Sequence, residues 1–292
     1  MAGSARTRSK HLDPSESPRL FYGAEMRFKR EQAGLTREEL GARVFVSGSY
    51  IAYLEKGARR VPADLAAQLD EILETDGFFV RNLAAGRSSP HPEFFADVAE
   101  LETVAVGIRT WEPLLVPGLL QTEAYAQAVI RGYDPVLPET AVRQRLDARL
   151  SRARVFDGAE KPLYWAVLNE AALRCPVGGP ATMADQLRHI AAMVGRNRII
   201  LQVLPFSAGA HAGLEGALKL MTFEDDSPLA YLPGIACGKL VDDPAAVKRY
   251  TLAYDLLGAA ALPPEASLAL IEAVAEEYEH GTQVRPDGGG VA

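Results

Sequence analysis

Two short helix patterns follow each other almost without a gap in residues 35–62, and this arrangement constrains the fold more than any other feature of the sequence. Thr36 and Glu39 form a capping box, in which the threonine hydroxyl accepts from the Glu39 amide and the Glu39 carboxylate accepts from the Thr36 amide. A helix is therefore predicted to start at Thr36. Ser47 is a favoured N-cap residue and predicts a second helix, which Gly57 ends.

Each predicted helix carries an apolar stripe. Leu40 and Val44 recur at i and i+4 in the first, and Ile51 and Leu54 recur at i and i+3 in the second. Two helices of about eight to ten residues with so tight a turn are typical of the helix-turn-helix motif, whose second helix enters the major groove of DNA. An ordinary helical hairpin in an all-α domain is the alternative.

The flanking segments favour the DNA-binding interpretation. Residues 22–34 predict one helix ahead of the pair, and Pro62 predicts the first position of another helix that continues to residue 73. Arg30 and Glu55 stand where a charged pair would join the first helix to the third. Four short helices thus fit between residues 21 and 73.

Residues 21–73 resemble the Cro/repressor-type helix-turn-helix module of the XRE family of transcriptional regulators. Residues 30–40 carry the pattern R-x-x-x-G-L-T-x-E-E-L, and residues 46–57 carry V-S-x-S-x-I-x-x-L-E-x-G. One departure from the family is Phe45, which stands at a turn position that is often glycine because the backbone there has a positive φ. The turn is therefore expected to be strained or differently shaped.

The resemblance predicts which side chains meet DNA. The second helix opens without Arg, Gln or Asn at the usual base-reading places, so recognition through DNA shape or bridging water is expected to carry much of the specificity. The residues expected to face base edges are Ser47, Gly48, Ser49, Tyr50 and Tyr53, and those expected on phosphates are Arg37, Lys56, Arg59 and Arg60.

Charge is divided unevenly along the chain. Residues 1–60 hold 12 Lys and Arg but 7 Asp and Glu, whereas the remaining residues hold 19 and 31, so the net charge of −7 separates into about +5 and about −12. A basic segment ahead of an acidic one is typical of a protein that brings only one end to a polyanion.

The length of 292 residues is enough for about two domains. The expected organisation is a flexible basic arm at 1–20, a helix-turn-helix domain at 21–85, a linker at 86–92, a regulatory or interaction domain at 93–280 and a disordered tail at 281–292. No apolar run is long enough for a secretory signal or a membrane span, and Cys175 and Cys237 are far apart in the chain. These features predict a cytoplasmic protein without a membrane partner.

The second half predicts a different fold class. Apolar runs predict strands, and amphipathic segments predict helices between and after them. The expected strands are 162–168, 197–206, 217–223, 229–234 and 235–241, and the expected helices are 139–156, 183–195, 243–262 and 263–278, while 94–111 is expected to be a helix entering a bend. Four arginines, Arg143, Arg145, Arg149 and Arg152, are expected on the exposed face of helix 139–156. The prediction is an all-α helix-turn-helix bundle followed by an α+β domain with a small mixed sheet.

Four stretches of this half, at residues 109–126, 169–180, 203–216 and 240–257, resemble in order the C-terminal domain attached to XRE-type regulators of actinobacteria, sometimes described as antitoxin-like. The resemblance implies a regulator of double-stranded DNA that often has a small partner protein encoded nearby. Such regulators usually meet a two-fold operator, so a homodimer is expected. The alternative is an antitoxin-like interaction protein that binds a small cognate partner and regulates its own operon.

The stretch around residues 109–125 is the candidate ligand or partner site, with Arg109, Trp111, Gln121 and Tyr125 as its residues. The alternative is that Trp111 is a core residue and Arg109 pairs with a carboxylate. No catalytic residues are expected, because Ser207 with His211, and Cys175 with His189, lack the surroundings of a nucleophile and base. No metal or cofactor is expected, since histidine spacings and glycine motifs for them are missing.

Overall fold

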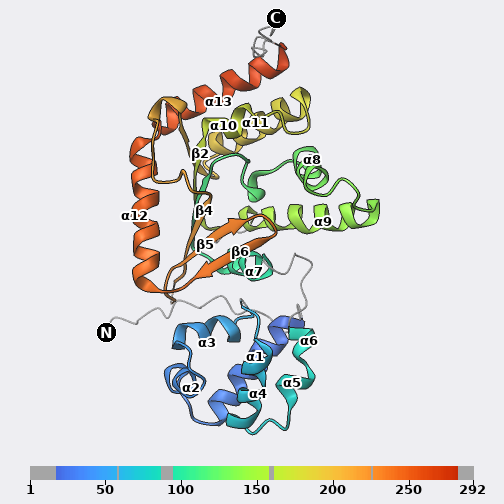
Figure 1. The fold of residues 1–292 in the computed structure, drawn as a ribbon, viewed down its shortest axis with the longest axis vertical. Coiled ribbons are helices and arrows are strands. Elements are labelled where there is room, and N and C mark those ends of the chain that lie inside the picture. The colour runs from blue at the N-terminus through green and yellow to red at the C-terminus, as the bar shows by residue number, and fades with distance from the viewer. Residues whose placement is uncertain (1–17, 58, 87–94, 158–160, 225, 282–292) are drawn as a thin grey trace, which may run out of the picture. The chain divides into compact units, whose positions relative to one another are not determined.

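A computed structural model describes residues 18–57, 59–86, 95–157, 161–224 and 226–281 (Figure 1). The chain forms two compact units, one of Met1–Val104 with Asp225–Ser227 and the other of Ala105–Glu224 with Pro228–Ala292. The predicted arm lies outside the described residues up to residue 17, as do most of the predicted linker and tail, so the predicted domain limits stay predictions.

The first unit is helical. Its helices are α1 (Pro18–Gln32), α2 (Arg37–Arg43), α3 (Gly48–Glu55), α4 (Ala63–Ile72), α5 (Phe78–Arg81), α6 (Leu83–Gly86) and α7 (Ala96–Val104). By its contacts, helix α7 lies in this unit.

Local capping sets the start of the two central helices. At α2 the capping box is complete, because the Thr36 amide donates to Glu39 Oε2 at 2.7 Å and the Glu39 amide donates to Thr36 Oγ1 at 3.1 Å. At α3 the Ser47 hydroxyl accepts from the Tyr50 amide at 3.1 Å. Pro62 is the N-cap of α4 rather than its first residue, one position from the prediction.

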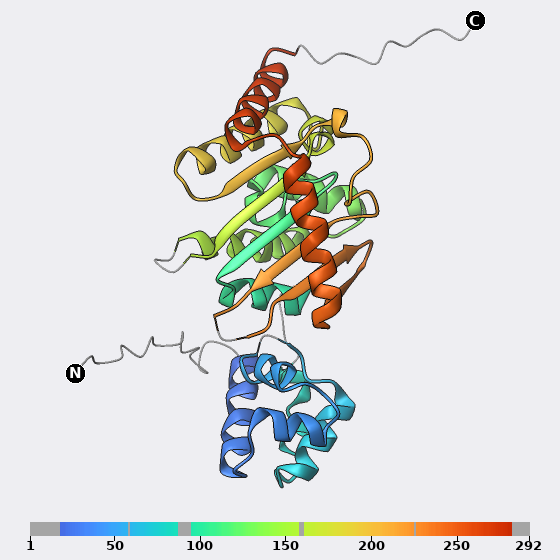
Figure 2. The same ribbon diagram turned by 90° about the vertical axis from the view of Figure 1, so that its left-hand side faces the viewer.

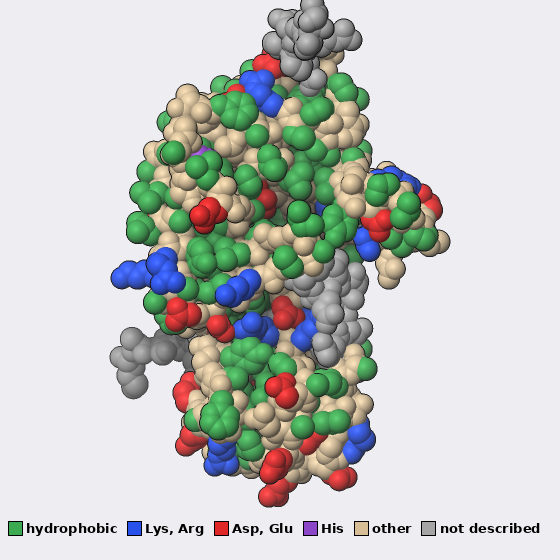
Figure 3. Space-filling view, viewed as in Figure 1, with side chains coloured by type: hydrophobic (Ala, Val, Ile, Leu, Met, Phe, Trp, Pro, Cys, Tyr) green, Lys and Arg blue, Asp and Glu red, His purple; other side chains and the backbone are tan. Residues whose placement is uncertain are grey.

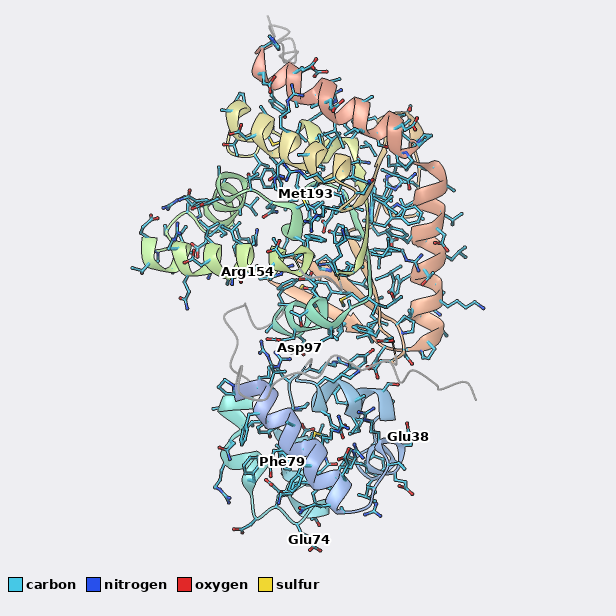
Figure 4. All side chains as sticks on the ribbon, turned by 180° about the vertical axis from the view of Figure 1, so that it is seen from behind. Glu38, Glu74, Phe79, Asp97, Arg154 and Met193 are labelled. Atoms are coloured by element: carbon cyan, nitrogen blue, oxygen red, sulfur yellow. The ribbon has the colours of Figure 1, made fainter. Side chains whose placement is uncertain are left out.

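The core of the first unit joins α1 to α5. Met26, Leu40, Ile51 and Leu69 are buried there together with Phe79, which is labelled in Figure 4. Gly41 permits the close approach of α2 to the turn that follows, since a Cβ at this position would lie 2.5 Å from the Val46 carbonyl oxygen. A helix pair with so short a connection needs a residue without a side chain at that point.

The second unit contains a six-stranded mixed sheet. Its strands are β1 (Gly107–Glu112), β2 (Leu163–Asn169), β3 (Ile200–Leu204), β4 (Leu218–Thr222), β5 (Leu229–Gly234) and β6 (Cys237–Val241), in the order β3-β2-β1-β4-β5-β6. Strands β1, β2 and β3 are parallel, and the pairs β1 with β4, β4 with β5 and β5 with β6 are antiparallel. The predicted fold class, a helical N-terminal region followed by an α+β region with a mixed sheet, is confirmed.

Helices cover both faces of this sheet. They are α8 (Glu123–Tyr133), α9 (Glu139–Arg152), α10 (Glu170–Arg174), α11 (Pro180–Gly195), α12 (Pro244–Ala260) and α13 (Pro264–Glu279), with short 3-10 turns η1 (Gly118–Leu120), η2 (Ala153–Phe156) and η3 (Phe206–Ala208). Figure 2 shows α12 across one face, where Tyr254 and Leu257 pack on Trp111 and Val167 of the sheet. Helices α8 and α9 lie on the opposite side (Figure 1).

Strand β1 is the element that the sequence interpretation missed. Residues 94–111 were predicted as a helix entering a bend, but the helix ends at Val104 and the chain continues as β1 in the middle of the sheet. Its neighbours β2 and β4 come from sequence-distant segments, and their hydrogen bonds hold it extended.

Membrane-spanning length is not found in any single described helix. Helices α12 and α13 are long and apolar enough only when taken together, and the chain bends by 71° between them.

Candidate nucleic-acid interface and ligand site

The turn between α2 and α3 has the backbone that the sequence led us to expect. Phe45 has a φ of 59°, and its side chain is 92% exposed. A left-handed conformation costs a residue with a Cβ about 1–2 kcal/mol relative to the ordinary helical region. The helix pair is held in place despite this cost by the buried stripes of α2 and α3.

The start of α3 is the accessible part of the helix. Ser47 is exposed, and Gly48 and Ser49 are half-buried. Tyr50 is also half-buried, and the Arg59 guanidinium lies over its ring at 4.6 Å. Glu38, labelled in Figure 4, reaches this end of α3, since a Cβ on Gly48 would lie 2.6 Å from its Oε1. An exposed carboxylate there complements the helix dipole but would repel a phosphate group.

The middle of α3 is buried. Tyr53 is 1% exposed, and its hydroxyl donates to the Ser227 carbonyl at 2.5 Å, a residue that belongs to the same unit. Ala52 beside it is 2% exposed. Tyr53, predicted to face a base edge, therefore faces protein in this structure, and the accessible set reduces to residues 47–50.

Arg37, Lys56 and Arg60, which were predicted to contact phosphates, have acidic neighbours. Arg37 Nε donates to Glu55 Oε2 at 2.9 Å. Lys56 forms an ion pair with Asp226, and Arg60 Nε lies 3.6 Å from Asp97 Oδ1. These side chains would have to exchange a carboxylate for a phosphate in order to bind DNA, which weakens the net gain from each contact.

Glu55 links three helices of the first unit. It is 6% exposed and accepts from Arg30 through two bonds, of which Nη2 to Oε2 measures 3.2 Å, as well as from Arg37. The hydrogen bond to Glu55 raises the pKa of Arg30. The predicted tie between the first and third helices is therefore present, and Arg37 adds α2 to it.

The residues of the predicted ligand site fall into two groups. Arg109 and Trp111 are two residues apart on β1 and therefore face the same side of the sheet, the side that α12 covers. On the α12 side, Trp111 is fully buried and its Nε1 donates to the Gly213 carbonyl at 3.1 Å. Arg109 Nη1 lies 3.1 Å from Asp255 Oδ1, and its guanidinium stands over the Tyr254 ring at 5.6 Å. Trp111 is thus a core residue and Arg109 is paired, the alternative that the sequence had left open.

Gln121 and Tyr125 form a separate polar cluster beyond the end of β1. The Gln121 side-chain amide donates to the Val116 carbonyl at 2.7 Å, and the Tyr125 hydroxyl accepts from the Val116 amide at 3.1 Å. Arg149 Nη1 donates to Gln121 Oε1 at 3.0 Å. Arg145, Arg149 and Arg152 were predicted to be exposed, but all three are half-buried, and the periodicity of α9 gave no signal of the contact of Arg149 with Gln121.

Burial shifts the pKa values of Arg149 and Tyr125 in this cluster, and of Glu112 at the end of β1. Burial, assisted by nearby Arg152, lowers the pKa of Arg149 to about 10, and burial raises the pKa of Tyr125 to about 12. Burial also raises the pKa of Glu112, the last residue of β1, to about 7, although Lys219 acts in the opposite direction. Groups with perturbed pKa values often gather at functional sites.

The surroundings of Ser207 with His211, and of Cys175 with His189, do not favour a nucleophile and its base. His211 Nδ1 accepts from the Gly213 amide at 3.2 Å, and its ring packs against Trp111 at 5.2 Å. Cys175 and His189 are both exposed, and burial of part of the ring lowers the pKa of His189. Within the described residues, no group of three or more His, Cys, Asp or Glu side chains could hold a metal ion.

Comparison with known families matches both parts of the chain. Residues 22–78 match a helix-turn-helix domain, and residues 95–273 match a domain of unknown function, DUF5753. A search of curated proteins found no match to this chain, and a search of solved structures found none either. Because the second match covers more than half of the sequence, the chain belongs to the DUF5753 family, and it carries a helix-turn-helix domain ahead of the family's domain.

Proposed function

We propose that this protein is a sequence-specific DNA-binding transcriptional regulator of the XRE type. The observation that carries the proposal is the α2–α3 pair, whose second helix begins with the accessible residues Ser47, Gly48 and Ser49. The helix-turn-helix match over residues 22–78 supports it, and so does the positive charge of the first sixty residues.

Residues assigned to base edges and residues assigned to phosphates should affect DNA binding in different ways. Ser47, Gly48, Ser49 and Tyr50 are assigned to base edges, and Arg59, beside Tyr50, is assigned to a phosphate. Arg59→Ala should weaken binding to all duplexes and reduce the salt slope by about 0.9. Ser49→Ala should instead change which sequence is preferred.

The test is selection of duplexes from a random pool by the full chain, followed by affinity measurement at several salt concentrations. Arg143→Ala is the matched control, because Arg143 is an exposed arginine of the second unit. It should leave both affinity and sequence preference unchanged. Recovery of no enriched sequence, with no salt-dependent binding to any duplex, would end the proposal.

A homodimer is the second part of the proposal. A single helix-turn-helix module makes a small interface, and two of them on a two-fold operator make a larger one. Leu252 and Leu256, one helical turn apart on α12, are 61% and 54% exposed. Figure 3 shows hydrophobic side chains along the edge where α12 lies. We place the dimer contact on this face of the second unit.

The second unit is proposed to receive a signal rather than to catalyse a reaction. The support is the pair of perturbed pKa values at and beyond the end of β1, those of Glu112 and Arg149. A small companion protein, as the resemblance implies, is an alternative signal. Purification from the native host separates the two, since a stoichiometric small protein would favour the companion and a retained metabolite would favour a ligand.

A further inference from the structure

The end of β1 has the topology of a ligand site. Strands β1, β2 and β3 are parallel and adjacent, so their carboxyl ends at Glu112, Asn169 and Leu204 lie along one edge of the sheet. The strand order also changes direction at β1, since β2 and β3 lie on one side of it and β4, β5 and β6 lie on the other. In open sheets flanked by helices, ligands bind outside the carboxyl ends of the parallel strands near such a change.

Two arginines of α9 converge on the turn that follows β1. Arg149 reaches the turn through its bond to Gln121, which in turn holds the backbone of Val116. Arg152 reaches it at Gly118, where an added Cβ would lie 3.3 Å from Arg152 Nη1. Glycine at this position leaves room for the second guanidinium to contact the turn.

The charge of Arg149 is poorly compensated. Within the described residues its hydrogen-bond partner is the neutral amide oxygen of Gln121, and no carboxylate pairs with it. Burial lowers the pKa of Arg149 to about 10, and the charge of Arg152, another cation, acts in the same direction. Half-buried guanidinium groups are normally balanced by a carboxylate or phosphate, because removing an unpaired charge from water is costly.

The face of the sheet opposite α12 carries further buried polar groups. Thr110 and Glu112 point to one side of β1 as alternate residues, and Lys219 of β4 stands opposite Thr110. The Thr110 hydroxyl makes no hydrogen bond of normal geometry among the described residues, although it lies near enough to Glu112 to lower the pKa of that carboxyl. A fully buried hydroxyl without a good partner indicates a group or water molecule beside it.

We propose that Arg149 and Arg152, with the turn at residues 116–121, bind the oxyanion group of a small ligand, a carboxylate or a phosphate. The planar guanidinium fork suits both groups, because each presents two oxygens at matching distance. Gln121 holds Arg149 in position for this role, and Tyr125 fixes the turn from the other side.

The binding is measured on the full chain without DNA, so that its outcome does not depend on the proposed function. Inorganic phosphate and succinate are titrated against the midpoint of thermal unfolding, with sodium chloride at equal ionic strength as the reference. We expect one of the two anions to raise the midpoint in a saturable way. Phosphate alone would identify a phosphate ligand, and succinate alone would identify a carboxylate ligand.

Variants of one helix supply the specificity control. Arg149→Gln should weaken the apparent binding at least 10-fold, whereas Arg143→Gln, on the exposed face of α9, should leave it unchanged. If Arg149→Gln does not fold, as judged by circular dichroism, Arg152→Gln gives the same comparison. No stabilisation of the wild type beyond chloride would overturn the inference, and so would equal stabilisation of wild type and variant.

Discussion

At the scale of single residues, the clearest conflict between local preference and fold is Phe45. Its φ of 59° is a conformation that L residues avoid, and with 92% of its side chain exposed it gains little from packing. Phe45→Gly should therefore raise the free energy of unfolding by about 1 kcal/mol, as measured by urea denaturation. Ala67→Gly, at an exposed position inside α4, is the control and should lower it by about 1 kcal/mol. Equal losses in both variants would contradict the assigned strain.

Glu112 gives a prediction about pH. Its pKa in the folded chain is about 7, above the ordinary carboxyl value, so the folded state holds the proton more tightly than the unfolded state. The contribution of Glu112 to stability is therefore present below about pH 4.5 and lost as the pH rises through about 7. The unfolding free energy of the wild type, minus that of Glu112→Gln, should fall by up to about 3 kcal/mol between pH 5 and pH 8, because only the wild type has a proton to lose at this position. A difference that is constant with pH would contradict it.

At the scale of secondary-structure elements, Glu55 joins α1, α2 and α3 through Arg30 and Arg37. Removal of its charge takes away the buried counter-charge of Arg30 and leaves the exposed Glu31, whose Oε1 lies 3.5 Å from Arg30 Nη2, which is costly for a buried guanidinium. We expect Glu55→Gln to lower the free energy of unfolding of the first unit by about 3 kcal/mol. Glu38→Gln, which changes an exposed carboxylate of α2, should lower it by well under 1 kcal/mol. Urea denaturation followed by circular dichroism would show similar losses for both if the network were unimportant.

The elements also show what sequence can predict. The capping box at Thr36 and the N-cap at Ser47 were predictable, because each depends on residues three positions apart. Strand β1 was not, since its extended backbone is fixed by hydrogen bonds to β2 and β4, which lie about 55 and 110 residues later in the chain. The contact of Arg149 with Gln121 was hidden for the same reason. The hydrogen bond of Tyr53 to the Ser227 carbonyl joins residues 174 positions apart, which no local pattern can reveal.

At the scale of the whole molecule, the uneven charge and the proposed dimer give the last prediction. Each copy brings a basic segment of about +5, so a dimer on an operator brings two. The number of phosphate contacts should therefore scale with the number of copies bound, and the salt dependence of binding should scale with it. Leu256→Glu places a charge on the apolar face of α12 and should convert the dimer to a monomer in light scattering.

The same variant should bind a two-fold operator at least 10-fold more weakly, with about half the salt slope of the wild type, because only one helix-turn-helix domain then remains in contact. Leu214→Glu is the matched control, since Leu214 is 67% exposed in the loop before β4 and lies outside α12. It should keep both the dimer and the affinity. A wild-type chain that scatters as a monomer, both free and on DNA, would remove the dimer from this account and leave the single helix-turn-helix domain to carry recognition alone.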